Sequence, residues 1–442
     1  MVAIVKNKAE KIPNKKQQEC IDSIKGQYLV LAGPGSGKTY TVTKRIKNMI
    51  EQGIDPSKIL CLTFSDAASA EMKSRVIKEL NVADISVDIF TFHSFCNDLI
   101  AEFPLDFNLA ADIKIITQPQ YNQLLKECIE EINPIEYRNS KNDPYKMIKP
   151  IKDGIDEIQR YRLNKEKYFK NLETNPDYKP QIAILEEEIE KNKGDEKKYK
   201  KALSSLEQLN KTIDKAVELF KFYELYQEKK EKNRLIDFAD MIDFVIEKFE
   251  TSPSFLNKIA NKYEYIMVDE YQDTNTAQNK IIFSLVDNMT EKNVFVVGDD
   301  DQTIYTFQGA KLDTIEKFIK HYPDVKIICL EENMRSTQNI LDAARYVVVQ
   351  DFSRLEANPE FKKYNISKEL ISKNPSLIDK NTPVILNKYL NQEQEYDDIV
   401  SQIEEIINSS SCPINENGKK NLSQIAILTK GNAQLKVFAN KL

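Results

Sequence analysis

A glycine-rich stretch, Ala32-Gly33-Pro34-Gly35-Ser36-Gly37-Lys38-Thr39, contains the residues best suited to chemistry. It follows the apolar run 28–31, which predicts a buried strand, and it precedes a helix-like run at 40–50. Glycines at such a junction let backbone N–H groups turn toward phosphates, and the helix N-terminus adds a positive dipole. Lys38 would reach the β- and γ-phosphates of a nucleotide, and the Thr39 hydroxyl would bind Mg²⁺. The alternative is a flexible turn with a chance lysine, which the flanking strand and helix argue against.

An acidic pair, Asp269-Glu270, directly follows a second apolar run at 263–268. A nucleotide hydrolase needs such a pair opposite its phosphate-binding loop. The aspartate binds Mg²⁺ through the water shell of the metal, and the adjacent glutamate can polarise the attacking water. An acidic pair after a strand is weak evidence by itself, but with the glycine-rich loop it indicates a site for a nucleoside triphosphate and Mg²⁺.

Further candidate residues come from the next strand end, at 298–302. Gln302 should lie beside the γ-phosphate, where a glutamine can orient water or sense the phosphate. Tyr305 and Phe307 alternate along an extended segment, and exposed aromatic rings at such a place suit stacking on single-stranded bases. The alternative is that both rings belong to the core.

Two polar residues lie outside these strand ends. Arg335 follows another expected strand, at 325–330, and could stabilise charge on a transferring phosphoryl group; a surface ion pair is the alternative. Gln17 precedes the glycine-rich loop, and its amide can both donate to and accept from adenine. An ordinary surface glutamine is the other interpretation.

The elements that must position these residues alternate between strands and helices, with further strands expected at 58–64 and 87–92. This alternation predicts a doubly wound parallel sheet whose ligands bind at the carboxyl ends of the strands. From about residue 110 the chain becomes Lys/Glu-rich and mainly helical. Two apolar stripes with spacings of three and four flank Gly194 and predict an inserted helical hairpin, although each stripe alone also fits a single amphipathic helix. Later strands are expected at 383–389 and 424–429, on either side of a helix at 393–407.

Composition limits the possible classes of protein. The chain has 442 residues, of which 41% are hydrophobic and 30% charged, and its net charge is −6. Such a chain is expected to be globular. Its net charge argues against nonspecific coating of nucleic acid, but it leaves room for a local basic groove. It lacks an apolar run of ~18 residues, and its polar N-terminus does not resemble a signal peptide. These features predict a cytoplasmic protein without a membrane span. The six cysteines form no Cys-x-x-Cys pair and there are two histidines, so zinc or iron–sulfur sites are not expected.

Taken together, these residues resemble the UvrD/Rep family of superfamily 1 DNA helicases. The resemblance spans nearly the whole chain, and the order and spacing of the motifs fit outside the helical insertion. The matching segments are 14–17 (Q motif), 32–39 (Walker A), 63–72 (motif Ia), 91–94 (motif Ib), 237–240 (re-entry into the first domain), 268–274 (motif II), 298–310 (motif III), 333–336 (motif IV) and 425–434 (motif IVa).

The resemblance implies an α/β fold in which a RecA-like, P-loop domain (1–110 and 235–330) carries a helical accessory insertion (111–234). The start of a second RecA-like domain would occupy 331–442. It also implies ATP-driven 3′→5′ movement on single-stranded DNA, with unwinding at junctions between single strands and duplex. The resemblance further assigns roles to individual residues. ATP would be bound by Gln17, residues 32–39, Tyr40 and Arg335, and Mg²⁺ by Thr39 and Asp269. The residues that take part in catalysis would be Lys38, Glu270, Gln302 and Arg335. DNA would be contacted by Phe64, His93, Tyr305 and Phe307.

Several positions depart from the family pattern. The motif III arginine is Gln308 and its usual tryptophan is Phe307, while the motif IV tyrosine that the family places against adenine is Met334. Motif Ia has Asp66-Ala67 where Asn-Lys is usual. We therefore expect weaker DNA affinity or coupling than is typical of the family.

The chain reaches Leu442 without a counterpart of motifs V and VI. The sequence is therefore interpreted as an N-terminal portion that binds ATP–Mg²⁺ but hydrolyses it weakly, because catalysis needs charge stabilisation from both sides of the cleft. The remaining motor region or its partner subunits are unknown. Three other classes share parts of this pattern: the motor subunit of a helicase–nuclease recombination complex, a structural ATPase of the Rad50/SMC type, and a small-molecule kinase. The SMC type lacks support because no Leu-Ser-Gly-Gly signature is present, and a kinase would not explain the aromatic segment after Gln302.

Overall fold

A computed structural model of the chain describes residues 12–442 apart from 108, 110–112, 139–142, 176–177, 304–312, 353, 410–411, 413, 415–417 and 419. The chain divides into two compact units, Met1–Lys380 and Asn381–Leu442. The break between the units follows Lys380, whereas the sequence analysis begins the second domain at 331. Residues between these points stay with the first unit because they continue directly from a strand of its sheet.

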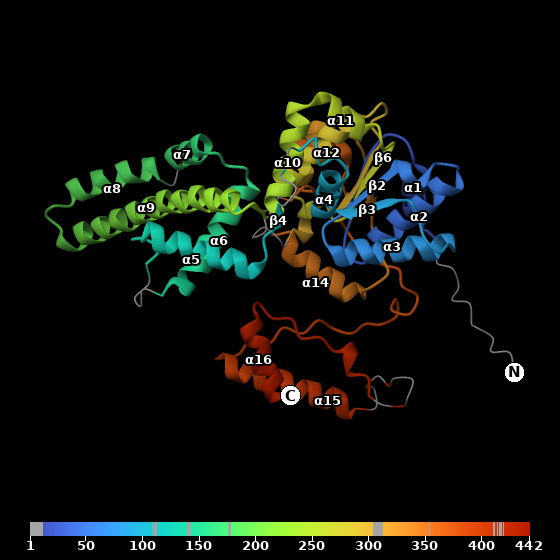
Figure 1. The fold of residues 1–442 in the computed structure, drawn as a ribbon. Coiled ribbons are helices and arrows are strands. Elements are labelled where there is room, and N and C mark those ends of the chain that lie inside the picture. Colours follow the sequence, from blue (N-terminus) through green and yellow to red (C-terminus); the bar gives the residue numbers. More distant parts are fainter. Residues whose placement is uncertain are drawn as a thin grey trace. The chain divides into compact units, whose positions relative to one another are not determined.

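The first unit is built on a six-stranded sheet of parallel strands in the order β3-β2-β6-β7-β1-β8 (Figure 1). Register places Leu31 opposite Gly298 and Val268 opposite Val296, so β1, β6 and β7 end at one edge of the sheet. The predicted parallel sheet is therefore confirmed. The strands are β1 (Gln27–Ala32), β2 (Ile59–Thr63), β3 (Asp88–Thr91), β6 (Tyr265–Val268), β7 (Val294–Gly298) and β8 (Lys326–Leu330).

Helices cover both faces of this sheet, as its strands require. Successive residues of β1 alternate between two apolar cores: Leu29 and Leu31 face one, and Tyr28 and Val30 face the other. Strands buried on both sides are near-continuously apolar, which is the pattern seen in the sequence. One face packs on α1 (Lys15–Asp22), α2 (Lys38–Glu51) and α3 (Asp66–Leu80). The other packs on α4 (Phe92–Glu102), α10 (Phe238–Thr251), α11 (Pro253–Ala260), α12 (Thr276–Asp287) and α13 (Thr314–His321).

Polar residues at the helix starts fix where the helices begin. The Ser65 hydroxyl accepts from the backbone N–H of Ala68 and caps α3. Asn14 and Gln17 form a capping box at α1, in which each side chain accepts a backbone N–H of the other. Such caps satisfy N–H groups that the helix itself leaves without partners.

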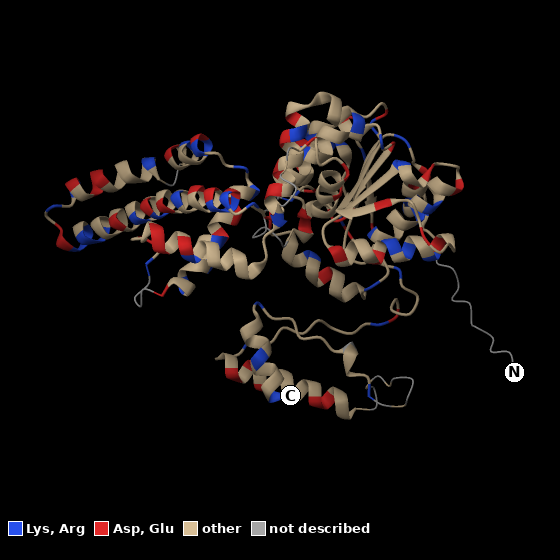
Figure 2. Ribbon diagram, in the orientation of Figure 1, with Lys and Arg blue, Asp and Glu red and all other residues tan. Residues whose placement is uncertain are grey.

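The insertion consists of α5 (Gln118–Ile132), α6 (Pro144–Arg160), α7 (Lys165–Thr174), α8 (Lys179–Lys191) and α9 (Glu196–Lys232). Helix α8 lies against α9, which confirms the predicted helical hairpin (Figure 1). Basic and acidic residues are interspersed along α8 and α9 (Figure 2). Short parallel strands β4 (Lys114–Ile115) and β5 (Leu235–Ile236) pair where the chain leaves and re-enters the first domain.

The later part of the first unit contains short elements that lie near the site. They are η2 (Tyr271–Asp273), η3 (Asp300–Gln302), β9 (Glu332–Asn333), α14 (Gln338–Val348), η5 (Pro359–Tyr364) and β10 (Ile371–Ser372); a further turn, η1 (Pro56–Lys58), precedes β2. Strands β9 and β10 pair with each other in parallel. Among the described residues, no helix is both long and apolar enough to cross a membrane.

The second unit contains α15 (Gln392–Asn408), η6 (Leu422–Gln424) and α16 (Asn432–Lys441). The prediction of strands at 383–389 and 424–429 was wrong, because the structure assigns no strand to either segment. A strand exists through hydrogen bonds to a neighbouring strand, and apolar β-branched sequence alone does not supply them. Several side chains of the first segment, such as those of Ile385 and Leu386, are exposed.

Candidate functional site

The glycine-rich loop joins β1 to α2 at the carboxyl edge of the sheet. Gly37 is the N-cap residue of α2 and has a φ of 91°, in the left-handed region that favours glycine. Gly35 is left-handed as well, and a Cβ there would lie 2.6 Å from both the Asn333 Nδ2 and the Arg335 Cβ. Ser36 stabilises the turn by donating its hydroxyl to the Gly33 carbonyl over 2.8 Å. The loop therefore needs glycine both for its backbone shape and for space.

The acidic pair lies directly against this loop. Lys38 Nζ is 3.0 Å from Glu270 Oε2, and the Thr39 hydroxyl donates to Asp269 Oδ2 over 3.4 Å. The two motifs, far apart in sequence, thus lie in direct contact, as expected. The strands that precede them, β1 and β6, flank β7 and end at the same edge of the parallel sheet, which brings the two motifs together.

Electrostatics at the acidic pair are unusual. Asp269 is 4% exposed, and burial together with the neighbouring Glu270 raises its pKa to about 7. The Asp269 carboxylate and the Thr39 hydroxyl lie side by side and are oxygen ligands that suit Mg²⁺. The positive charge of the metal would offset the cost of keeping the buried Asp269 carboxylate ionised. Glu270 has a φ of 49°, an uncommon conformation for a residue with a side chain. Strain of this kind concentrates at functional sites, where the surrounding structure maintains it.

Gln302 reaches the same pocket from the end of β7. Its Oε1 accepts from Lys38 Nζ over 3.4 Å, and its Nε2 donates to Asp299 Oδ2 over 2.7 Å. A second glutamine, Gln272, donates to Glu270 Oε2 over 2.8 Å and accepts from the Asp299 backbone N–H over 3.0 Å. Hydrogen bonds therefore connect Asp299 to both Lys38 and Glu270.

Segment 333–335 packs on top of the loop. The Asn333 side chain donates to the Pro34 carbonyl, and the Met334 backbone N–H donates to the Gly35 carbonyl over 2.9 Å. Arg335 is exposed, with its Cβ against Gly35. The structure thus places Arg335 at the loop, although its role in charge stabilisation stays a prediction.

Gln17 is held within the protein. Its Nε2 donates to the Ser36 carbonyl over 2.8 Å, and its Oε1 accepts from the Asn14 backbone N–H over 3.0 Å. The side chain is buried and ties α1 to the loop. Tyr40, in the first turn of α2, is half-buried beside Lys44. Contact of either residue with a nucleotide stays a prediction.

Two of the four candidate DNA contacts, Phe64 and His93, line one cavity of about 550 Å³ between the sheet domain and the insertion. The His93 ring meets Phe238 edge to face at 5.6 Å, and burial lowers the pKa of His93. The insertion contributes the α6 residues Lys152 and Arg160 to the lining. Tyr305 and Phe307 lie outside the described residues.

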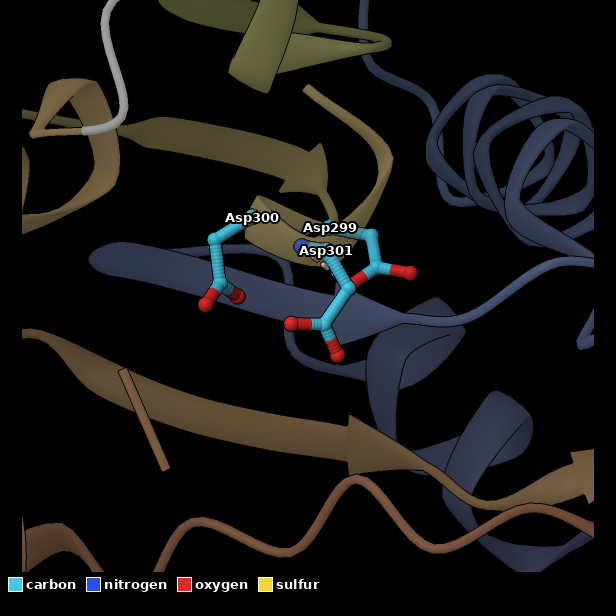
Figure 3. A group of neighbouring side chains, drawn as sticks. All are labelled: Asp299, Asp300 and Asp301. Carbon is cyan, nitrogen blue, oxygen red and sulfur yellow. Dashed lines mark hydrogen bonds between the residues drawn. The ribbon is translucent and has the colours of Figure 1, made fainter. Parts of the chain in front are cut away.

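Sequence reasoning missed two basic residues, Lys368 and Arg354. Asp299, Asp300 and Asp301 follow β7 (Figure 3), and their carboxylates lie close enough together to hold a metal ion. The Lys368 ammonium lies among them, at 2.6, 2.6 and 2.7 Å. Burial alone would lower the pKa of Lys368, but the three carboxylates outweigh it and raise that pKa. No motif marks the polar segment 351–382, so only the fold reveals this contact.

The fold and the pocket together define the class of protein. A parallel sheet with a glycine-rich loop after β1, an acidic pair after β6 and a glutamine after β7 is a P-loop nucleotide-binding domain. Residues 13–323 match the model of the UvrD/REP helicase N-terminal domain, and residues 328–442 match that of the UvrD-like helicase C-terminal domain. The chain belongs to the UvrD/Rep helicase family. The resemblance seen in the sequence is therefore confirmed, and the family argues against a structural ATPase of the SMC type.

Named relatives agree with this assignment. The chain is 30% identical over 430 residues to the ATP-dependent DNA helicase PcrA of Bacillus subtilis, an alignment covering 97% of this chain and 49% of that protein. It is 31% identical over 396 residues to the probable DNA helicase II homolog of Mycoplasma capricolum, covering 89% of this chain and 46% of that protein. The chain thus spans about half the length of these relatives.

Proposed function

We propose that this chain is the nucleotide-binding portion of an ATP-dependent DNA helicase that moves 3′→5′ on single-stranded DNA. Its membership of the UvrD/Rep family supports the proposal, as does its similarity to proteins named as DNA helicases. The observation that carries it is the contact of Lys38 and Thr39 with Glu270 and Asp269. That contact joins a phosphate-binding loop to the carboxylates that hydrolysis requires.

In this proposal the loop 32–39 and Tyr40 hold the phosphates of ATP, with Lys38 on the β- and γ-phosphates. Thr39 and Asp269 would hold Mg²⁺, which when bound neutralises phosphate charge. Glu270 polarises the attacking water, and its contacts with Lys38 and Gln272 keep its carboxylate aimed into the pocket. In the ATP-bound state Lys38 would exchange Glu270 for phosphate oxygens and leave the carboxylate to act as the general base.

Gln302 and Arg335 complete the proposed site around the γ-phosphate. The amide of Gln302 orients the water or senses the phosphate, and Arg335 stabilises the charge that develops during transfer. For adenine, Gln17 would use the second hydrogen of its Nε2, because the first is donated to the Ser36 carbonyl. The adenine contact and the shape of the loop are therefore coupled through one side chain.

Single-stranded DNA and its junctions with duplex are the proposed partners. Phe64 and His93 would contact DNA in the cavity of about 550 Å³, whose lining includes the basic residues Lys152 and Arg160. Keeping His93 neutral by burial suits contact with bases rather than phosphates. Tyr305 and Phe307 are proposed to extend this contact. In domain terms, 1–110 and 235–330 form the first motor domain, 111–234 the accessory domain, and 331–442 the beginning of the second.

Hydrolysis of ATP by the purified chain, with and without Mg²⁺ and single-stranded oligothymidylate, tests the proposal. Glu270→Gln should lower kcat about 10²- to 10⁴-fold, since it removes the general base, while nucleotide still binds. Lys38→Ala should abolish binding of a fluorescent ADP analogue. Lys320→Met is the matched control, because Lys320 lies at the surface, where it pairs with Glu316 and Glu360. The proposal is contradicted if the unsubstituted chain neither binds nor hydrolyses ATP in the presence of Mg²⁺. It is also contradicted if Glu270→Gln hydrolyses ATP as fast as the unsubstituted chain.

A further inference from the structure

The carboxylates that follow β7 are held by side chains from a distant segment of the chain. Lys368, whose side chain is 4% exposed, contacts Asp299, Asp300 and Asp301. Arg354 adds a bidentate pair to Asp301, with both nitrogen–oxygen distances at 2.7 Å. Three carboxylates this close would repel one another strongly in a buried site, so the cations are what keep them together.

One of these aspartates also orients the glutamine at the nucleotide pocket. Asp299 accepts from Lys368 on Oδ1 and from the Gln302 amide nitrogen on Oδ2. An ionised carboxylate only accepts hydrogen bonds, so the NH₂ end of Gln302 must face Asp299. The carbonyl end of the same amide then faces Lys38, from which it accepts. Lys368, Asp299, Gln302 and Lys38 therefore form a continuous chain of polar contacts.

Backbone contacts fix the same segment to the end of β7. The Leu355 backbone N–H donates to Asp300 Oδ2 over 2.9 Å, and Glu356 accepts from the Lys368 backbone N–H over 3.1 Å. Glu356 also pairs with Arg354. The position of the Lys368 ammonium is thus set by several bonds, as a group that positions another must be.

We infer that Lys368 is a positioning residue for Gln302 in ATP hydrolysis, an inference that rests on the proposed function. Without the ammonium, Asp299 Oδ1 keeps only the backbone N–H of Asp301, 3.2 Å away, and the two neighbouring carboxylates repel the Asp299 carboxylate. Gln302 then loses the bond that selects its amide orientation. Nucleotide binding depends on the loop and Lys38, which keep their own contacts, so Lys368 acts on turnover rather than on affinity.

The experiment measures kcat and KM for ATP with Mg²⁺ and saturating oligothymidylate in Lys368→Met, Gln302→Ala and the double variant. Lys368→Met should lower kcat about 10- to 100-fold, the cost of a misplaced group, with KM and the affinity for a fluorescent ADP analogue nearly unchanged. Because the two residues act through one contact, the double variant should be no slower than Gln302→Ala. Lys320→Met should match the unchanged chain.

The inference is overturned if the fold-reduction in kcat of the double variant equals the product of the two single reductions. It is also overturned if Lys368→Met raises KM and leaves kcat unchanged. Lys368→Met/Asp300→Asn guards against misfolding, because it removes one negative charge together with the positive one. Its kcat should remain well below that of Asp300→Asn alone, and equal values would overturn the inference. A crystal structure of Lys368→Met should show that the hydrogen bond between Asp299 and Gln302 is broken. An intact hydrogen bond would refute the positioning role of Lys368, whether or not the variant hydrolyses ATP. If the unchanged chain hydrolyses no ATP, the proposed function itself fails, and this inference with it.

Discussion

Replacing Lys230 by methionine should loosen the insertion from the sheet domain. Lys230 lies in the last turn of α9, and its ammonium lies 2.6 Å from carboxylate oxygens of both Asp237 and Asp240 at the start of α10. The side chain is 3% exposed, so the substitution would leave two carboxylates buried without their cation. Removing one partner from a buried ion pair costs about 3–5 kcal/mol.

The bonds that remain place the expected loss near the lower end of that range. Asp237 still accepts from Gln159 over 2.9 Å and from Tyr226 over 3.2 Å. Both carboxylates also lie at the N-terminus of α10, where the helix dipole favours negative charge. We therefore expect Lys230→Met to lose about 3 kcal/mol of unfolding free energy at neutral pH.

Acidification should reduce this loss. Burial and Asp237 already raise the pKa of Asp240, and without Lys230 the folded state should hold a proton there still more readily. A carboxyl group whose folded-state pKa exceeds its unfolded value stabilises the fold as pH falls. The gap between Lys230→Met and the unchanged chain should therefore narrow from about pH 7.5 to about pH 5. Lys230→Met/Asp240→Asn should recover part of the loss at neutral pH.

Urea unfolding followed by circular dichroism at both pH values measures the effect, and hydrogen exchange locates it at α9 and α10. Lys165→Met is the matched control, because its exposed pair with Glu224 also joins α9 to another helix of the insertion. Exposed pairs contribute about 0–1 kcal/mol. The reasoning is refuted if Lys230→Met loses no more than Lys165→Met, or if its loss is the same at both pH values.

Three further predictions concern the supports of the site. Arg45→Met should cost about 2–4 kcal/mol, because this buried side chain donates to carbonyl oxygens at the end of α1 over 2.6 and 2.9 Å; urea unfolding measures it. Gly37→Ala should weaken nucleotide binding, since its Cβ would lie 2.7 Å from Gln17 Nε2 at a φ of 91°; titration with a fluorescent ADP analogue measures it. Burial outweighs Arg162 and raises the pKa of Asp243 to about 6. The folded state then binds the proton more tightly, so this group's contribution to stability should fall as pH rises from about 4 to about 6, and Asp243→Asn should remove that slope.

Matched variants make these predictions falsifiable. Gly53 has the same φ of 91° with open space around its Cβ, so Gly53→Ala strains the backbone without touching the loop. If Gly37→Ala and Gly53→Ala bind nucleotide with equal affinity, the conformation of the glycine-rich loop at Gly37 is not needed for nucleotide binding. Arg75→Met removes an exposed ion pair with Glu71 and serves as the control for Arg45→Met. If both variants lose the same unfolding free energy, the buried hydrogen bonds of Arg45 at the end of α1 do not stabilise the fold as argued. An unchanged slope of stability with pH in Asp243→Asn would contradict the third prediction.

The sequence by itself determined which residues meet at the proposed nucleotide site. Runs 28–31 and 263–268 are apolar enough to be recognised as buried strands, and residues directly after parallel strands meet at one edge of the sheet. The convergence of Lys38, Thr39, Asp269, Glu270 and Gln302 follows from this rule and from local sequence. The hairpin of the insertion was equally readable, because a repeated spacing of three and four is a local property of helices.

Only the tertiary structure decided which polar groups pair across long distances. Lys368 comes from a segment without a motif, and its place among three carboxylates depends on how that segment folds back onto β7. The two strands wrongly expected in the second unit have the same cause, since a strand needs a partner that its own residues do not specify. Periodicity and capping act between neighbours in sequence and can be read from it. Ion pairs and sheet hydrogen bonds join residues that only the completed fold brings together.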